Sequence, residues 1–258
     1  MQVLPVAELA RVWISSKPPK GWRLRLPTQF GSSNNMAQRD SSPLPSPAHL
    51  QPYQDQIDAL IEVGKVFWQR GWSVGTSSNY SAVVSRQPRQ LLLTASGKHK
   101  GQLTRADFVL VDEQGQPTLP DQPKSSAETL LHCVASEDAN VGAILHTHSV
   151  WSTVLSDRFA PQGGILLEGY EMLKGLSGVT THQHAEWLPI FDNTQDIPVL
   201  AEQVRAAMAN PGRPLAHGYI IRRHGIYTWG KDIDEAFRQI EIIEFLLECL
   251  GRSAMLGS

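Results

Sequence analysis

The feature of the 258-residue sequence that most clearly points to chemistry is the His-x-His pair His146 and His148, directly after the apolar run 141–145. In a β-strand, residues i and i+2 project from the same face, so two imidazoles emerge side by side at a strand end. Neutral imidazole is a common ligand of zinc, and two imidazoles need at least one further protein ligand. The spacing therefore indicates a metal site completed by a residue from elsewhere in the chain.

Two other parts of the sequence offer that ligand. His224 lies in a glycine-containing turn between two apolar runs, whereas His182 and His184 form a second His-x-His pair with polar flanks. Taken alone, a His-x-His motif arises easily by chance and is more often a surface pair than a ligand set. The strand context favours His146 and His148 as ligands, with His224 ranked ahead of the second pair.

Two glutamates are candidates for proton transfer. Glu128 ends the segment Ser125-Ser-Ala-Glu128, which has the spacing of a capping box, in which Ser125 caps a helix and Glu128 reaches back to a backbone N–H. That structural interpretation accounts for the spacing by itself, and an acid/base role is the alternative. Glu171 lies in the glycine-flanked segment 168–175, where it is either a solvated acid at a helix start or an acid/base group facing a pocket.

A polar loop, 94–101, follows an apolar run and reads Thr-Ala-Ser-Gly-Lys-His-Lys-Gly. Its backbone N–H groups, hydroxyl groups and two ammonium groups can bind a single phosphate. It lacks the glycine spacing and the Lys-Ser/Thr ending of a P-loop. The polar loop 76–81 is a second segment that can line the same site, although either loop alone is more often an ordinary connection.

The elements that must position these residues alternate along the chain. Helical spacing or start signals predict helices over 57–67, from near 125, after 149, over 197–208 and over 233–250. Strands are predicted over 81–85, 91–94, 108–111, 141–145, 219–222 and 225–229. The hairpin-like neighbours indicate a mixed or antiparallel sheet rather than a doubly wound parallel one.

Composition excludes several classes of protein. The 23 Lys and Arg residues nearly balance 25 Asp and Glu residues, which argues against a general nucleic-acid binder. No apolar stretch approaches the roughly 20 residues that cross a bilayer. The two cysteines, Cys133 and Cys249, cannot form a disulfide framework and fit a reducing cytoplasm. A soluble cytoplasmic enzyme remains.

The N-terminal segment differs from the rest. Residues 1–40 contain six basic and two acidic residues, and 43–47 carries proline at every second position. Alternating prolines block a helix and favour an extended linker. We therefore expect residues 1–50 to be a disordered extension and residues 51–258 to be the folded domain. A transit peptide, or an upstream extension before a start at Met36, are alternative interpretations.

Five segments occur in the order typical of the class II aldolase/adducin-like family, and the sequence resembles that family over about residues 52–250. They are 75–81, 94–97, 125–128, 146–148 and 223–225. Three longer segments, 144–149, 171–175 and 222–230, resemble the dehydratases within the family. The resemblance implies an α/β fold, a three-layer α/β/α single domain with a mainly antiparallel central sheet. It also implies a homotetramer with active sites near subunit interfaces.

The resemblance assigns roles position by position. His146, His148 and His224 match the three ligands of one Zn²⁺ per subunit. Glu171 matches the acid/base glutamate of the dehydratases, and Glu128 matches the catalytic glutamate of the sugar-phosphate aldolases. The family's substrate- and phosphate-binding positions correspond to Asn79, Ser96, Gly97, Lys98 and Ser126.

The function that this resemblance implies is a hydro-lyase reaction in methionine salvage. The expected reaction is zinc-dependent dehydration of 5-methylthioribulose 1-phosphate to 5-methylthio-2,3-dioxopentyl phosphate. The partner is then a small sugar phosphate, with no nucleic acid and no membrane. One alternative is retro-aldol cleavage of a related ketose phosphate. Another is a non-catalytic adducin-like interaction module, which should lack the metal ligands.

Overall fold

The computed structural model describes residues 47–212 and 215–257, which fall in a single structural unit. Most of the predicted extension, residues 1–46, lies outside the described residues. Its last residues are described, and they belong to the fold: Leu50 lies in the 3-10 helix η1 (Ala48–Tyr53) and is fully buried. The folded part of the chain therefore includes residues 47–50, which the prediction placed in the extension.

A single eight-stranded sheet forms the centre of the described unit, in the order β3-β2-β1-β4-β8-β7-β6-β5. Every neighbouring pair is antiparallel except β6 and β7, which are parallel. The strands are β1 (Asn79–Arg86), β2 (Arg89–Thr94), β3 (Phe108–Asp112), β4 (Ala143–Thr147), β5 (Gly164–Glu168), β6 (Ala185–Phe191), β7 (Gly218–Ile221) and β8 (Gly225–Gly230). The predicted, mainly antiparallel sheet is confirmed.

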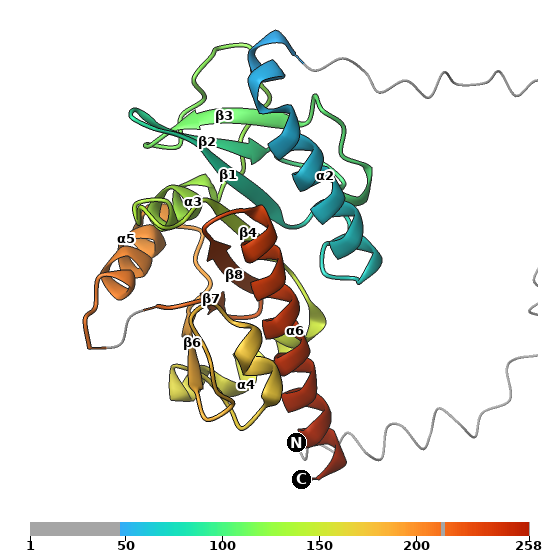
Figure 1. Ribbon diagram of the computed structural model, residues 1–258, viewed down its shortest axis with the longest axis vertical. Helices are drawn as coiled ribbons and strands as arrows, with labels where there is room; N and C mark the ends of the chain where they lie inside the picture. The colour runs from blue at the N-terminus through green and yellow to red at the C-terminus, as the bar shows by residue number, and fades with distance from the viewer. Residues whose placement is uncertain (1–46, 213–214, 258) are drawn as a thin grey trace, which may run out of the picture. The chain divides into compact units, whose positions relative to one another are not determined.

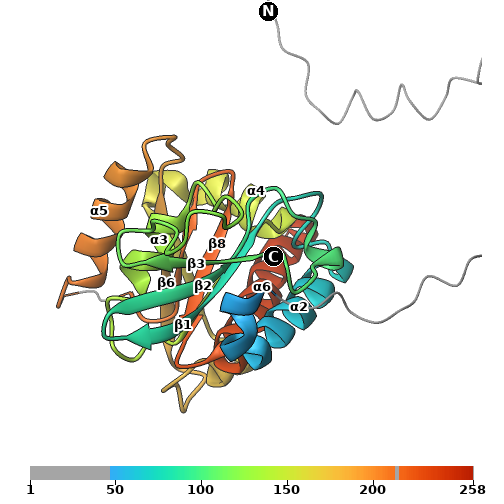
Figure 2. The same ribbon diagram turned by 90° about the horizontal axis from the view of Figure 1, so that it is seen from above.

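Helices cover both faces of this sheet, which gives the predicted three layers. Figures 1 and 2 show α3 and α5 on one face and α2, α4 and α6 on the other. The helices are α2 (Gln54–Gln69), α3 (Thr129–Ala135), α4 (Val150–Phe159), α5 (Ile197–Met208) and α6 (Ile233–Leu256), with short 3-10 turns η2 (Lys100–Gln102), η3 (Ala160–Gln162) and η4 (Glu171–Gly175). Within the described part of the chain, no helix is both long and apolar enough to cross a bilayer.

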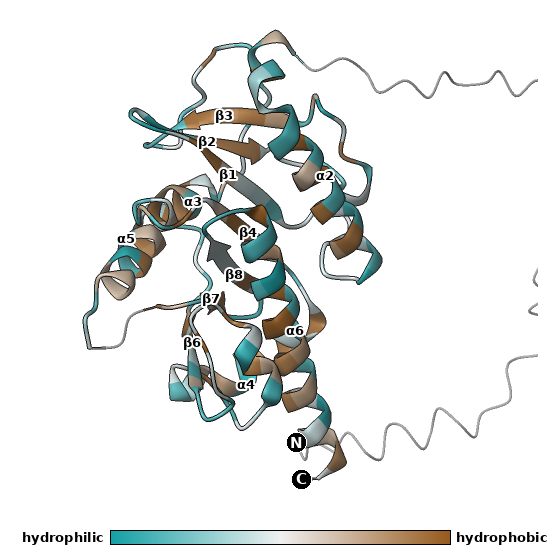
Figure 3. Cartoon of the chain, viewed as in Figure 1, coloured by the Kyte–Doolittle hydropathy of each residue, from teal (hydrophilic) through white to brown (hydrophobic). Residues whose placement is uncertain are grey.

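Amphipathic spacing explains why α2 packs on the sheet. Ile57, Leu60 and Phe67 recur at helical intervals and are fully buried. The helix ends before Gly71, whose φ of 75° is in the left-handed region that glycine adopts without strain. Figure 3 shows the resulting alternation of hydrophobic and hydrophilic residues along α2 and α6.

Alternation along the strands decides which side chains reach the site. In β4, Leu145 packs into the apolar cluster that α2 and α6 cover, whereas Ile144 packs into the cluster that α3 and α5 cover. His146 is two residues beyond Ile144 and is completely buried on the same face. The His146 imidazole therefore points into the protein interior near the C-terminal end of β4.

Strands β5 and β6 are absent from the sequence-based prediction. Pro189 interrupts the apolar run of β6, and proline usually marks an edge or a break because it lacks a backbone donor. In the structure Pro189 lies opposite Gly164 at the end of the β5–β6 ladder, where the missing donor is tolerated. The pairing of β5 with β6 at the edge of the sheet therefore outweighs the unfavourable effect of Pro189 on strand formation.

Candidate metal centre

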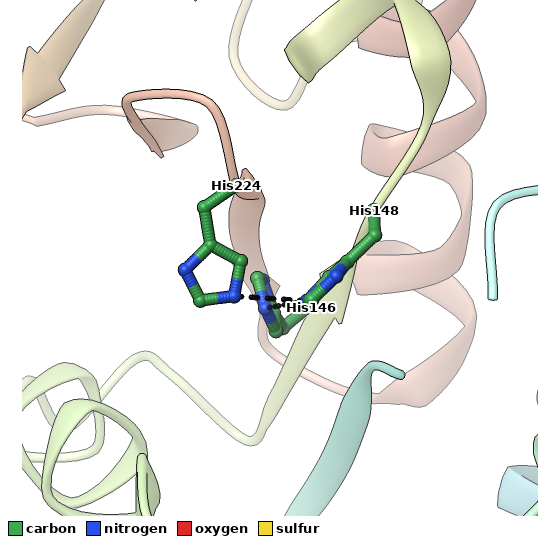
Figure 4. A group of neighbouring side chains, drawn as sticks. All are labelled: His146, His148 and His224. Carbon is green, nitrogen blue, oxygen red and sulfur yellow. Dashed lines mark hydrogen bonds between the residues drawn. The ribbon is translucent and has the colours of Figure 1, made fainter. Parts of the chain in front are cut away.

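Three histidines converge at one end of the central strands. His146 is in β4, His148 follows β4 directly, and His224 lies in the turn between β7 and β8. The Nε2 atom of His148 is 2.7 Å from Nε2 of His146 and 3.0 Å from Nε2 of His224. Figure 4 shows the three rings directed toward one another. The structure thus brings together all three residues that the sequence comparison marked as metal ligands.

The tautomer of His146 is fixed by the backbone. Its Nδ1 lies 2.9 Å from the carbonyl oxygen of Ile226, and a carbonyl accepts only, so Nδ1 carries the proton. The ring stacks on Tyr227 with centroids 4.0 Å apart. The unprotonated Nε2 therefore faces the other two histidines, which is the arrangement that outer hydrogen bonds impose on metal-binding imidazoles.

Burial keeps the rings of His146 and His148 neutral. Desolvation lowers the pKa of His146 well below its usual value and that of His148 to about 3, and the neighbouring His224 lowers both further. A neutral imidazole has one nitrogen with a free lone pair, and the three Nε2 atoms lie close enough together for one cation to bind all of them. The donor set fits Zn²⁺, which binds imidazole nitrogen and leaves a position open for a further ligand in catalytic sites.

Close packing of the β7–β8 turn on β4 places His224. A Cβ atom on Gly225 would lie 2.0 Å from the carbonyl oxygen of Thr147, so only glycine fits at this position. Arg222 and Arg223, the two residues before His224, are held by α4. Their guanidinium groups each lie 2.8 Å from a carboxylate oxygen of Asp157 in that helix. The turn is therefore fixed from both sides.

The capping-box interpretation of Glu128 is wrong. Glu128 itself is the N-cap residue of α3, and its side chain makes no capping hydrogen bond. Its carboxylate instead faces the histidines, with Oε1 3.2 Å from Nε2 of His224 and Oε2 3.5 Å from Nε2 of His146. A carboxylate at this distance is placed to accept or return a proton beside the metal position.

A chain of buried polar groups orients that carboxylate. Asn79 Nδ2 and the Tyr227 hydroxyl donate to Glu128 Oε2 at 2.8 and 3.0 Å. Burial lowers the pKa of His132 to about 3, and its neutral ring bridges Asn79 Oδ1 and the hydroxyl of Ser81. His132 and Tyr227 were not predicted from the sequence. The register of β8 against β4, which pairs Tyr227 with His146, is the signal that would have found the tyrosine.

A pocket opens beside the histidines. It contains four of the five residues that the resemblance assigned to substrate and phosphate binding. The lining residues are Thr76, Ser77, Ser78, Asn79, Thr94, Ala95, Ser96, Gly97, Lys100, Ser126, Glu128, His148 and His224. The two polar loops predicted from sequence, 76–81 and 94–101, therefore meet at one site.

The ammonium group in this pocket belongs to Lys100 rather than Lys98. Lys98 points away from the lining, and its Nζ lies 2.7 Å from Asp107. Lys100 begins the turn η2 and is almost completely buried, with Nζ donating to the carbonyl oxygen of Lys98 at 2.8 Å. Burial lowers the pKa of Lys100 to about 8. The sequence identified two ammonium groups in this loop, but not which one faces inward.

Glu171 lies outside the pocket of its own chain. It is the first residue of η4, its side chain is exposed, and Lys174 Nζ lies 2.5 Å from its carboxylate. That ammonium group lowers the pKa of Glu171, so the carboxylate is ionised at neutral pH. His182 is 3.7 Å from the same carboxylate, and His184 contacts Glu186 instead. Neither residue therefore joins the centre formed by His146, His148 and His224, which we call the first centre.

Comparisons with known proteins agree with this geometry. Residues 58–250 match the family described as Class II Aldolase and Adducin N-terminal domain. The chain is 49 % identical over 200 residues to the methylthioribulose-1-phosphate dehydratase of Marinobacter nauticus, covering 76 % of this chain and 93 % of the relative. It is 47 % identical over 191 residues to the enzyme of the same name from Sorangium cellulosum, covering 74 % of this chain and 88 % of the relative.

Solved structures support the fold. The L-fuculose-1-phosphate aldolase of Thermus thermophilus superposes with a TM-score of 0.61 and 20 % identity, covering 80 % of this chain and 99 % of that chain. A likeness at this identity establishes the architecture, and the chemistry has to be argued from the site itself.

Proposed function

Because the chain belongs to the class II aldolase and adducin family, we propose that it is a lyase that dehydrates 5-methylthioribulose 1-phosphate to 5-methylthio-2,3-dioxopentyl phosphate. The observation that carries the proposal is the identity of 49 % to a dehydratase of that name, 93 % of which the match covers. The convergent histidines, the carboxylate of Glu128 and the adjoining polar pocket supply the groups that such a reaction needs. The reaction belongs to methionine salvage, and we place the enzyme in the cytoplasm.

We propose zinc as the ion of the histidine centre. His146, His148 and His224 would hold it through their Nε2 atoms. When bound, it supplies Lewis-acid polarisation of the substrate's C2 carbonyl, which acidifies the proton on C3. An imidazole binds a metal ion in its neutral form, so three imidazole ligands would leave the full positive charge of the ion available for that purpose.

Dehydration then requires one proton to leave C3 and one to reach the departing C4 hydroxyl. We assign both transfers to a carboxylate oxygen of Glu171: it accepts the C3 proton as the C3–C4 double bond forms, and it protonates the C4 hydroxyl, which leaves as water. The resulting enol ketonises to the diketone. Glu128, held by Asn79 and Tyr227 next to His224, orients the substrate hydroxyl groups and supports these transfers.

The exposure of Glu171 has a consequence for assembly. A side chain that is exposed on its own chain and lies outside that chain's pocket reaches a reacting substrate only from a second copy. We therefore propose a homo-oligomer, a tetramer by family resemblance, in which Glu171 of one subunit completes the site of its neighbour.

The phosphate group of the substrate fits the loop 94–101. Gly97 has a φ of 71°, and a Cβ atom there would meet nothing within 4 Å, so the backbone is open to an incoming group. Ser96 and Ser126 contribute hydroxyl groups, and Lys100 contributes the inward ammonium. Hydrogen bonds from charged donors are the strong ones in phosphate recognition.

Retro-aldol cleavage is the second candidate. Glu128 stands at the position that the resemblance assigns to the catalytic glutamate of the aldolases, and it lies closest to the histidines. A non-catalytic interaction module is disfavoured, because such a module has no need for three convergent ligands and an oriented acid.

Product analysis tests the proposed reaction. Zinc-loaded protein incubated with 5-methylthioribulose 1-phosphate is expected to release 5-methylthio-2,3-dioxopentyl phosphate, identified by mass spectrometry. Chelator should abolish this release, and added zinc should restore it. Dihydroxyacetone phosphate and (methylthio)acetaldehyde, the two products of C3–C4 cleavage, with no diketone, would instead establish the aldolase candidate.

A pair of matched variants tests the acid/base assignment. Glu171→Gln keeps the shape of the side chain and removes its basicity, so kcat should fall about 10²- to 10⁴-fold, while bound zinc measured by mass spectrometry stays unchanged. Glu128→Gln should lower kcat less. If Glu171→Gln retains activity and Glu128→Gln loses it, the proton-transfer role belongs to Glu128.

The two lysines of the phosphate loop provide an internal control. Lys100→Met should raise KM about ten- to a hundredfold, because it removes a charged hydrogen-bond donor from the pocket. Lys98→Met, which removes the ion pair with Asp107, should leave KM within about twofold.

In the wild type, phosphate binding should weaken as the pH rises through about 8, where Lys100 loses its proton, and Lys100→Met should lack this limb of the pH profile. The reverse ranking of the two variants would contradict the assignment.

A further inference from the structure

A second cluster of metal-binding side chains lies outside the site described above. His184 immediately precedes β6, Glu186 is the second residue of β6, and His217 immediately precedes β7. The nearest ligand atoms of the three lie within 4.8 Å of one another. Glu186 Oε2 is 2.8 Å from His184 Nε2 and 2.8 Å from His217 Nδ1, and Glu186 and His217 are buried.

This second cluster is separate from the first centre. Its pocket is lined by Gly230 and Val141. Gly230 pairs with Ala143 at one end of the β4–β8 ladder, and Val141 lies two residues before Ala143. The first centre lies at the opposite end of the same ladder, where Thr147 pairs with Ile226. The two clusters therefore share no residue.

The ring of His217, like that of His146, is held by a backbone carbonyl, but through Nε2 instead of Nδ1. Its Nε2 lies 2.8 Å from the carbonyl oxygen of Ser177, which can only accept a hydrogen bond. Nε2 therefore carries a proton, and Nδ1 is directed at Glu186. A backbone carbonyl that fixes one nitrogen and leaves the other for an ion is the usual outer partner of a metal-binding histidine.

An unpartnered acceptor lines the same pocket. Gln239, on α6, is 2 % exposed and donates through Nε2 to the carbonyl oxygen of Trp229 at 3.0 Å. Its Oε1 atom is buried and has no hydrogen-bond partner. A buried amide oxygen without a donor costs on the order of 1–3 kcal/mol, so a bound ion or its coordinated water would satisfy it.

The charge around the pocket suits a cation. Glu186 is buried between the two histidines, and Asp138 and Glu235 line the pocket together with one basic side chain, Lys231. His184 is the most exposed of the three cluster residues, with about a third of its side chain accessible. An ion can therefore enter past His184.

We propose that His184, Glu186 and His217 bind a second divalent transition-metal ion of the zinc class. Two imidazole nitrogens and one carboxylate oxygen are a donor set typical of zinc, at metal–ligand distances of about 2.0–2.2 Å. Binding displaces the proton that Nδ1 of His217 shares with Glu186 and shifts that of His184 to its other nitrogen. The ion joins the starts of β6 and β7, the one parallel pair of the sheet, and so has a structural role distinct from the first centre.

Metal stoichiometry tests this proposal. The full chain is stripped with chelator, titrated with Zn²⁺, passed through a desalting column and analysed by inductively coupled plasma mass spectrometry. The wild type is expected to retain two ions per chain. His184→Gln and His148→Gln should each retain one, and the double variant should retain none.

His182→Gln is the matched control, because His182 is an exposed neighbour outside the cluster and its loss should leave two ions bound. Circular dichroism confirms that each variant is folded, and His184, being partly exposed, tolerates replacement. As a second readout, zinc should raise the melting temperature of His148→Gln but not that of the double variant. One ion in the wild type that His184→Gln retains, or two ions in His184→Gln, overturns the proposal. A count that falls in His184→Gln but is unchanged in His148→Gln supports the proposal and counts against the three-histidine centre.

Discussion

The approach of the β7–β8 turn to the end of β4 is the constraint on which the rest of the site depends. Gly225 allows a backbone contact that a Cβ atom would prevent, since such an atom would lie 2.0 Å from the Thr147 carbonyl. The contact brings His224 to His146 and His148, which are distant from it in sequence. The same register places Ile226 where its carbonyl fixes the tautomer of His146, and places Tyr227 where it stacks on that ring. One glycine thus allows the approach that positions His224 and, through Ile226, fixes the tautomer of His146.

The second determinant is the release of Glu128 from helix capping. A glutamate at the start of a helix is usually engaged by the helix itself. In this chain the Glu128 side chain makes no capping hydrogen bond, and its backbone N–H donates to the Ser126 hydroxyl, so the carboxylate is available to the site. Asn79 and Tyr227 then hold it through a buried network that extends to His132 and Ser81. The polar interior between α3 and the sheet therefore serves the orientation of one acid.

The sequence predicted the local features and missed those that depend on tertiary contact. The helices α2, α5 and α6, the central strands and the place of His146 and His148 at a strand end follow from periodicity, turn residues and motif, whereas the choice of His224 as the third predicted ligand rested on the family resemblance. Strands β5 and β6 were missed because Pro189 masks an edge pairing that only the assembled sheet stabilises. Lys100 is buried in the pocket, whereas Lys98, two residues earlier, forms an ion pair with Asp107 outside it. The spacing of the two lysines in the sequence does not show which one faces the pocket. Glu186 and His217 are 31 residues apart and meet only because β6 and β7 are parallel.

The central claim is that the Nε2 atoms of His146, His148 and His224 bind one metal ion. A crystal structure of the zinc-loaded wild type, with data collected above and below the zinc absorption edge, tests it directly. The account predicts an anomalous peak about 2.0–2.1 Å from each of the three Nε2 atoms, next to the carboxylate of Glu128. Density in which the three rings remain within hydrogen-bond distance of one another, with no anomalous peak between them, would contradict it.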